Sequence, residues 1–270
     1  MEKLINYYQS FDEWGRLDRE PVEFMVNYRH ILSNLPAEGH ILDIGAGPGK
    51  YSIALAKSGY QVTLADLTPR QVEIAKHKAK EAGMEKQFMG FHVADARELS
   101  RYADEQFDAS LMLGPLYHLQ TEEDRMKAVN EIWRVTKRGG LVFVAFMSRL
   151  RHLTTSLLFP EAWKPNHTVN GIEEFLESGV YNHTDEGRFT GAYFFNIEEI
   201  KPFMESQGFE SVNLISSGSI AGAMREEQWD YWRQRGEMEY NKVMEIVMQA
   251  SESPYIQGLS SHLLYIGRRV

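Results

Sequence analysis

The sequence predicts an α/β fold built on a doubly wound, mostly parallel sheet. Two observations lead to this prediction. Short apolar segments rich in β-branched residues alternate with segments of helical periodicity, and the connections between them are short. The first apolar segment, residues 40–44, runs directly into a glycine-rich turn. In sheets of this type ligands bind beyond the carboxyl ends of the strands, where the strand order reverses, so we expect the turn to border a site.

Seven segments have the length and apolar composition of sheet strands. Five of them lie where strand and helix patterns alternate regularly, and two lie near the C-terminus. The predicted strands are residues 40–44, 61–65, 88–93, 107–113, 141–146, 209–216 and 262–267. Right-handed crossovers between parallel strands then place helices on both faces of the sheet.

Helices are predicted where apolar residues recur with helical spacing and end signals flank them. Pro21 suits the first turn of a helix, because its missing N–H is not needed there. Residues 68–71 match a capping box with Thr68 as the cap. The predicted helices run from Pro21 to Leu35, from the glycine turn to Gly59, from Thr68 to Gly83, from Thr121 to residues 137–140, and from Asn196 to Gly208.

We divide the chain into four parts. Residues 1–36 form an N-terminal helical flap, and residues 37–147 form the ligand-binding core. Residues 148–195 form a lid insertion. Residues 196–270 complete the sheet and carry a helical insertion at about 222–254. Both insertions are rich in aromatic residues, and we expect both to cover the carboxyl edge of the sheet.

The composition of the 270 residues excludes several classes of function. Lys and Arg number 29 and Asp and Glu 38, a net charge of −9, which argues against a nucleic-acid partner. The chain has no cysteine, which excludes disulfides, thiolate nucleophiles and thiolate-bound metals. Its nine histidines show no metal-ligand spacing, so we expect no metal. The longest apolar run, 141–147, is far below the ~20 residues that span a bilayer. We therefore expect a cytoplasmic protein that does not act on membranes.

The glycine-rich turn, Asp43 to Gly49, has the pattern D-x-G-x-G-x-G. A dinucleotide fingerprint would need glycine at Lys50, and a nucleotide-triphosphate loop would need glycine at Ile44. Both ligand classes are excluded on this ground. The carboxylate of Asp43 favours a ligand that carries a positive charge. It could also order the turn by accepting backbone N–H groups.

Residues 41–49 resemble the first motif of class I S-adenosylmethionine-dependent methyltransferases. Asp66, at the end of the second strand, resembles the acidic residue that in this family holds the ribose hydroxyls. Asp95-Ala96, after the third strand, resembles the pair beside the adenine. Residues 113–118 correspond to the segment that in this family faces the transferred methyl group. Residues 134–141 resemble the segment of the family that leads from the last helix before the fifth strand into that strand.

The resemblance covers residues 35–146 and implies the cofactor S-adenosylmethionine, with S-adenosylhomocysteine as product. It implies that the last two strands form a C-terminal antiparallel hairpin in a seven-stranded sheet. Asp95 would receive the exocyclic amine of the adenine, or it could cap the following helix. The implied cofactor-binding residues are Asp43, Gly45, Ala46, Gly47, Gly49, Asp66, Leu67, Asp95, Ala96, Leu113 and Gly114.

Two groups of residues are candidates for work at the methyl end of this site. His118 is the candidate general base, or a hydrogen-bonded loop residue that shapes the pocket, and Tyr117 stands beside it as a wall or a catalyst. In relatives with an N-terminal extension, that segment folds over the donor. Tyr8 and Arg16 could then reach the donor's carboxylate, or the segment could merely cover the core. The aromatic stretch 189–195 could line an acceptor pocket or pack the insertion onto the sheet.

The resemblance implies transfer of a methyl group to O, N or S of a small organic acceptor by direct in-line displacement. One alternative is methylation of RNA or protein, which predicts a basic face near the site. Arg149, Arg151 and Lys164 make only a modest basic cluster. A second alternative is a protein that binds S-adenosylmethionine without catalysis.

Overall fold

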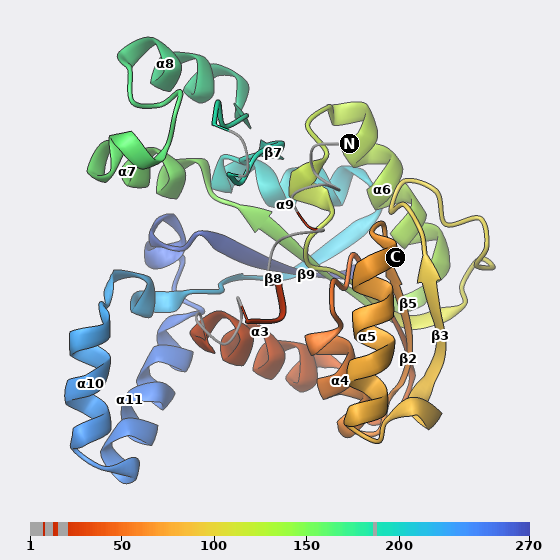
Figure 1. The fold of residues 1–270 in the computed structure, drawn as a ribbon. Coiled ribbons are helices and arrows are strands. Elements are labelled where there is room, and N and C mark those ends of the chain that lie inside the picture. The colour runs from red at the N-terminus through yellow and green to blue at the C-terminus, as the bar shows by residue number, and fades with distance from the viewer. Residues whose placement is uncertain (1–7, 9–12, 16–20, 186–187) are drawn as a thin grey trace.

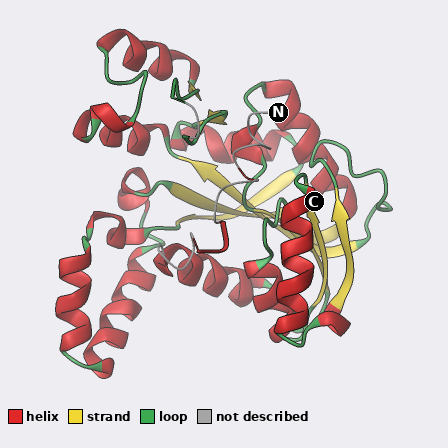
Figure 2. Cartoon of the chain, in the orientation of Figure 1, coloured by secondary structure: helices red, strands yellow, loops and turns green. Residues whose placement is uncertain are grey.

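The computed structural model describes residues 8, 13–15, 21–185 and 188–270 (Figures 1 and 2). A seven-stranded sheet runs through the middle of the molecule, with helices on both of its faces. Two helical units extend from the end of the sheet, one formed by α7 and α8 and the other by α10 and α11. Within the described residues, no helix has both the length and the apolar character needed to cross a bilayer.

The sheet has the strand order β3-β2-β1-β4-β5-β9-β8. The strands are β1 His40–Ile44, β2 Gln61–Asp66, β3 Phe88–Val93, β4 Phe107–Met112, β5 Thr136–Met147, β8 Phe209–Ser216 and β9 His262–Arg269. The first five are parallel, and β9 runs antiparallel between β5 and β8. The doubly wound sheet and its C-terminal antiparallel pair, both predicted above, are confirmed. Because the order reverses between β1 and β4, the carboxyl ends of these two strands border the crevice.

The helices follow the predicted pattern, with small shifts at their ends. The α-helices are α3 Pro21–Asn34, α4 Lys50–Lys57, α5 Pro69–Glu81, α6 Glu122–Val135, α7 Arg149–Leu158, α8 Val169–Ser178, α9 Ile197–Ser206, α10 Glu226–Gln234 and α11 Glu237–Ala250. The short 3-10 helices are η1 Glu85–Gln87, η2 Leu116–His118, η3 Pro160–Ala162, η4 Ser219–Ala223 and η5 Pro254–Leu259. Thr121 caps α6 as predicted, since its hydroxyl accepts from Asp124 N at 3.2 Å. Thr68 precedes α5 but makes no side-chain cap, so the predicted capping box is wrong.

Two apolar clusters fill the space between the sheet and its helices. On one face, α3, α4 and α5 contribute residues such as Ile31, Leu55 and Ala75. On the other face, α6 and α9 contribute residues such as Ile132 and Met204. Helices packed on both faces bury the central strands, which is why β1, β2 and β4 are buried along most of their length.

The lid insertion, residues 148–195, folds around a small apolar cluster of its own. It carries α7, α8 and the two-stranded sheet of β6 Val180–Tyr181 and β7 Ala192–Tyr193. An isolated bridge between Ser148 and Phe195 brings its two ends together. Its cluster of Phe175, Tyr181, Ala192 and Phe194 anchors the described part of the insertion as a unit.

The second insertion carries helices α10 and α11. They form a unit that extends from the end of the sheet (Figure 1), and α11 contacts η4. His30 Nε2 lies 3.0 Å from Ser251 Oγ, which follows α11. Met248 joins the core cluster that α3 shares with the sheet. The C-terminal end of α11 is therefore held against α3 and the core.

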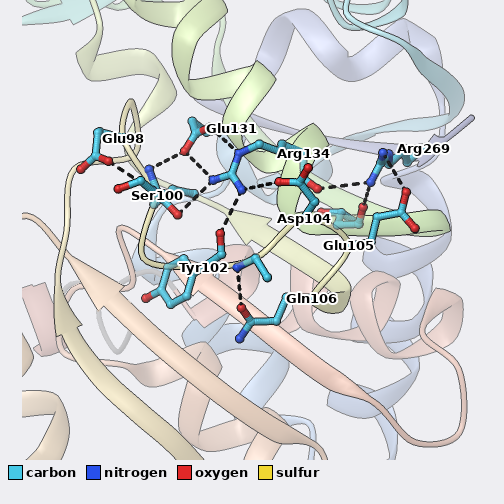
Figure 3. A network of polar contacts seen from close by, with 12 residues as sticks. Glu98, Ser100, Tyr102, Asp104, Glu105, Gln106, Glu131, Arg134 and Arg269 are labelled. Atoms are coloured by element: carbon cyan, nitrogen blue, oxygen red, sulfur yellow. Dashed lines mark hydrogen bonds and ion pairs between the residues drawn. The ribbon is translucent and has the colours of Figure 1, made fainter.

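An ion-pair network fixes the loop that follows β3 (Figure 3). The guanidinium of Arg134 on α6 donates to Glu131 at 2.8 Å and to Asp104 at 2.8 Å. It also donates to the carbonyl oxygens of Leu99 and Tyr102, at 3.0 and 2.9 Å. These bonds tie residues 98–106 to α6, so the segment that carries Asp95 is held at both ends by regular structure.

Candidate functional site

A cavity lies across the carboxyl ends of the parallel strands. Its empty volume is about 1220 Å³, which includes a part open to solvent. The predicted site residues that line it are Tyr8, Asp43, Gly45, Ala46, Gly47, Asp66, Leu67, Asp95, Ala96, Leu113, Gly114, Tyr117 and His118. Gly49 does not line it but begins α4 with φ +83°, and Arg16 lies outside the described residues. Residues from four separate strand ends thus meet at one cavity.

The glycine turn is held against two neighbouring strands. The N–H groups of Gly45 and Ala46 donate to Ala65 O at the end of β2, at 2.8 and 3.1 Å. Gly45 has φ +70°, and a Cβ added to it would clash with Pro115 Cγ in the turn after β4. Glycine is therefore required both by the backbone conformation and by the close approach of the two turns.

Asp66 connects the glycine turn to the end of β2. One carboxylate oxygen accepts from Gly47 N and the other from Thr68 N, both at 2.8 Å. Burial raises the pKa of Asp66, although these backbone bonds and the Thr68 hydroxyl oppose the rise. The hydroxyl of Thr68 is thus directed to Asp66, which explains why it does not cap α5. These three donors leave one of the four lone pairs of the carboxylate for a ligand's hydroxyl group.

Asp43 lies deepest among the acidic residues of the cavity and is 2% exposed. Its Oδ2 accepts the hydroxyl of Ser52 at 2.6 Å. Burial raises the pKa of Asp43 to about 7, and the nearby charge of Asp66 adds to the rise. The bond to Ser52, a residue of α4, shows that Asp43 orders the start of that helix. A cation bound beside it would favour its ionised form.

Asp95 is oriented by an arginine two residues later. Arg97 donates to it from Nη2 at 2.6 Å, from Nε at 3.0 Å and from the backbone N–H at 2.9 Å. Burial alone would raise the pKa of Asp95, but the bonds from Arg97 outweigh it and lower the pKa. Arg97 also donates to Asp124 at 3.1 Å. Asp95 is therefore an ionised acceptor held in one orientation at the β3 side of the cavity.

Both ring nitrogens of His118 are engaged. Its Nδ1 lies 3.2 Å from the carbonyl oxygen of Gly191, and because a carbonyl only accepts, Nδ1 carries the hydrogen. Burial lowers the pKa of His118 to about 4, so the ring is neutral at pH 7. Nε2 is then an acceptor, and the hydroxyl of Tyr8 donates to it at 2.8 Å. Tyr8 has to move, or relay a proton, before His118 can act as a base.

Two segments meet at His118, the N-terminal one through Tyr8 and the insertion 148–195 through Phe189 and Gly191. Gln71 of α5 donates from Nε2 to the carbonyl oxygen of Tyr8 at 2.8 Å. Phe189 and Gly191 of the lid insertion contact His118, the former through rings 5.5 Å apart. Of the aromatic stretch 189–195, Phe189 thus reaches the site, whereas Phe194 and Phe195 pack in apolar clusters.

Several residues of the cavity wall were not predicted. Glu23 of α3 lines the cavity, and its Oε2 lies 2.9 Å from His262 Nδ1 at the start of β9. Asn27, one helical turn further along α3, also lines it and donates to the hydroxyl of Tyr51 at 3.3 Å. The sequence contained a pattern that could have indicated them. The polar residues at positions 23 and 27 lie on one side of a helix whose other side carries the apolar stripe. No sequence pattern indicates that Glu23 pairs with His262.

Two buried amide oxygens face this cavity. Asn27 and Gln71 are each 3% exposed, and both line the cavity. Within the described residues, neither Asn27 Oδ1 nor Gln71 Oε1 has a hydrogen-bond partner. Since buried polar atoms in native proteins are nearly always paired, these oxygens are suited to hydrogen-bond donors of a ligand. No group of three His, Asp or Glu side chains that could hold a metal occurs in the described part of the chain.

Comparison with known proteins identifies relatives of the chain. Residues 42–144 match a family model described as a methyltransferase domain. The ubiquinone/menaquinone biosynthesis C-methyltransferase of Zymomonas mobilis is 30% identical over 190 residues, which cover 68% of this chain and 74% of that protein. The demethylmenaquinone methyltransferase of Leptospira interrogans is 30% identical over 141 residues. That match spans 52% of this chain but only 55% of the relative's length.

Solved structures show the same architecture. An S-adenosylmethionine-dependent methyltransferase from Methanosarcina mazei superposes with a TM-score of 0.60 at 21% sequence identity. The superposition covers 89% of this chain and 97% of that one. The likeness in fold therefore extends beyond the region that the family model matches.

Proposed function

Because the chain belongs to the class I S-adenosylmethionine-dependent methyltransferases, we propose that it transfers the methyl group of this cofactor to a small organic acceptor by direct in-line displacement. The observation that carries the proposal is the cavity itself. It joins the acidic residues at the ends of β2 and β3 to the turn after β4, and Tyr8 and the lid insertion meet over it.

The residues of the cavity fit the cofactor's chemistry. Asp66 keeps a free lone pair for a ribose hydroxyl, and Asp95 is an ionised acceptor for the adenine amine. Asn27 and Gln71 offer buried, unpaired oxygens to its remaining hydrogen-bond donors. Tyr8 stands at the cavity wall, where it is a candidate for the donor's amino-acid end.

The bound cofactor supplies a methyl group that its own sulfonium already activates. The protein therefore needs no covalent intermediate and has to position the acceptor and exclude water. Such positioning lowers a reaction barrier by roughly 7–11 kcal/mol in favourable cases. The contacts of His118 with Tyr8 and Gly191 serve both tasks, because they hold two covering segments over the cavity.

A small acceptor is supported by this covering and by the net charge of −9, which does not favour nucleic acid. The relatives from Zymomonas and Leptospira are named for methylation of quinone precursors, the former at carbon. We therefore add carbon to oxygen, nitrogen and sulfur as the accepting atom.

The test combines binding with a product search. Calorimetry should detect binding of S-adenosylhomocysteine to the purified protein. Incubation of the protein with isotope-labelled S-adenosylmethionine and a metabolite extract should yield a labelled small molecule in mass spectrometry. Label that appears only in added RNA or protein would refute the small acceptor, and binding without any transfer would refute the enzyme.

A further inference from the structure

His152 lies at the centre of the lid insertion. Its imidazole is 5% exposed, and four aromatic rings surround it at centroid distances of 4.3 to 5.0 Å. The four rings belong to Trp163, which follows η3, Phe175 of α8, Tyr181 of β6 and Phe194, which follows β7. Phe194 stacks on the imidazole, and the other three meet it edge to face. His152, on α7, thus joins this helix to α8, to β6 and to the segment after β7.

The imidazole brings a polar atom into this aromatic cluster. In the described part of the chain, Nε2 of His152 is buried and has no hydrogen-bond partner. Buried polar atoms in native proteins are nearly always paired, so an unpaired one points to a specific use. An apolar side chain of similar size would fill the same space without a buried polar atom. What distinguishes histidine from such a side chain is that its ring binds a proton near neutral pH.

The closed insertion keeps this proton off the ring. Burial lowers the pKa of His152 from 6.5 to about 3, and no carboxylate of the described residues offsets the fall. One helical turn earlier on α7, the buried guanidinium of Arg149 donates from Nε to the carbonyl oxygen of Phe194 at 3.1 Å. A positive charge is therefore already held beside the cluster, and a proton on His152 would add a second one.

The other titratable groups of the surrounding elements have partners of their own or face solvent. The hydroxyl of Tyr181 donates to the carbonyl oxygen of Lys164 at 2.9 Å, and Lys164 Nζ lies 3.3 Å from Asp185. His183, whose ring lies 6.1 Å from that of Tyr181, has its Nε2 3.1 Å from the carbonyl oxygen of Ala162. The carboxylate residues of η3 and α8 are exposed: Glu161, Glu173, Glu174 and Glu177.

We propose that His152 is an acid-sensitive latch of the lid insertion: its neutral ring holds the aromatic cluster together, and protonation of the ring opens the insertion. Opening brings the ring into water, where it binds a proton, so proton uptake and opening are linked. The effect reaches the cavity, because Phe189 packs against the same cluster and its ring lies 5.5 Å from that of His118. The carbonyl oxygen of Gly191, 3.2 Å from His118 Nδ1, belongs to the same insertion. The latch is a property of the fold and does not depend on the proposed methyl transfer.

The two pKa values of His152, in the closed and the open insertion, give the sign and size of the effect. A base whose pKa is lowered in the closed form stabilises that form above its ordinary pKa, and this stability is lost as the pH falls below it. The equilibrium constant for opening should therefore rise about tenfold per pH unit from about pH 6.5 down toward pH 3. At about pH 5 it should be about thirtyfold larger than at about pH 7.5.

Hydrogen exchange of the full chain, followed by mass spectrometry, tests the latch. After correction for intrinsic exchange rates, peptides of α7 and α8 should lose about thirtyfold in protection between pH 7.5 and pH 5, whereas peptides of β1 and β4 should lose much less. His152→Phe keeps an aromatic ring but binds no proton, so its α7 and α8 peptides should be protected equally at both pH values. His152→Met is a second variant whose unbranched side chain adapts to the cluster, and it should behave in the same way.

Two other histidines provide the controls. Burial also lowers the pKa of His92, which lies on β3 outside the insertion, so His92→Gln should keep the thirtyfold loss in α7 and α8. Burial lowers the pKa of His118 as well, and its ring contacts the insertion through Gly191. His118→Asn keeps a donor for that carbonyl oxygen and should also keep the loss.

Three results would overturn the proposal. Persistence of the loss in both His152→Phe and His152→Met would show that another group senses the pH. Disappearance of the loss in His118→Asn would assign the acid response to the cavity side of the insertion. Equal loss of protection in β1, β4, α7 and α8 of the wild-type protein would show that the whole chain unfolds and that the insertion has no latch of its own.

Discussion

Replacement of Asp66 separates its two roles, in the glycine turn and in binding. Asp66→Ala removes the acceptor of two backbone N–H groups, those of Gly47 and Thr68, each at 2.8 Å. Leaving a buried donor unpaired costs about 1–3 kcal/mol, so the free energy of unfolding should fall by about 2–6 kcal/mol. Asp66→Asn keeps one acceptor oxygen and should lose about half as much.

Asp66→Ala should also weaken cofactor binding. A hydrogen bond from a ribose hydroxyl to the carboxylate contributes about 1.5–3 kcal/mol. Its loss should weaken the affinity for S-adenosylhomocysteine by roughly 10- to 10²-fold, because each 1.4 kcal/mol is tenfold. The glycine turn also loses its bond from Gly47 to Asp66, which adds to the loss.

Calorimetry with S-adenosylhomocysteine measures the affinity, and urea unfolding followed by circular dichroism measures the stability. Asp230→Ala is a suitable control, because Asp230 forms a surface ion pair with Arg233 on α10, away from the cavity. It should change neither quantity. Equal affinities of Asp66→Ala and wild-type protein, with both folded, would refute the assignment of this cavity to the cofactor.

Three further predictions concern the core of the site. Burial raises the pKa of Asp43 from 3.8 to about 7, so the folded state holds a proton that the unfolded state releases, and stability falls as the pH rises between these values. Between about pH 5 and 7 the free energy of unfolding of the wild-type protein should fall by about 1.4 kcal/mol per pH unit because of this group, and Asp43→Asn should lack that fall. Urea unfolding measures both proteins, and parallel pH profiles of wild type and variant would contradict the burial argument. Gly45→Ala should abolish cofactor binding in calorimetry and cost about 1–3 kcal/mol more stability than Gly59→Ala, because only the former Cβ meets Pro115. Arg134→Ala should lower the urea midpoint, since it frees the loop after β3, whereas the exposed ion pair of Arg233 should not matter; equal midpoints for the two variants would argue against the network.

Much of the fold and half of the site could be predicted from contiguous residues. The strand at 40–44 and the turn from Asp43 to Gly49 are local features, because an apolar run and glycine backbone freedom need no distant partner. Asp66 and Asp95 could be located for the same reason, since each directly ends or follows a strand. Parallel strands bring such ends to one edge of a sheet.

Other predictions failed or were incomplete where a second contact competes for the same group. Thr68 has a capping sequence, but Asp66, two residues before it, takes its hydroxyl and its N–H. The second insertion was expected over the site, but none of its described residues lines the cavity. In both cases the local pattern was present, and other contacts changed its use.

The sequence by itself determined the sheet, the glycine turn and the acidic strand ends, because backbone preferences and apolar periodicity act over a few neighbouring residues. Only the tertiary structure decided the pairs that close the cavity. Tyr8 and His118 are 110 positions apart, and Glu23 and His262 are 239 apart. Such pairs form only once packing of the whole chain brings their segments together, and no short-range pattern encodes that arrangement.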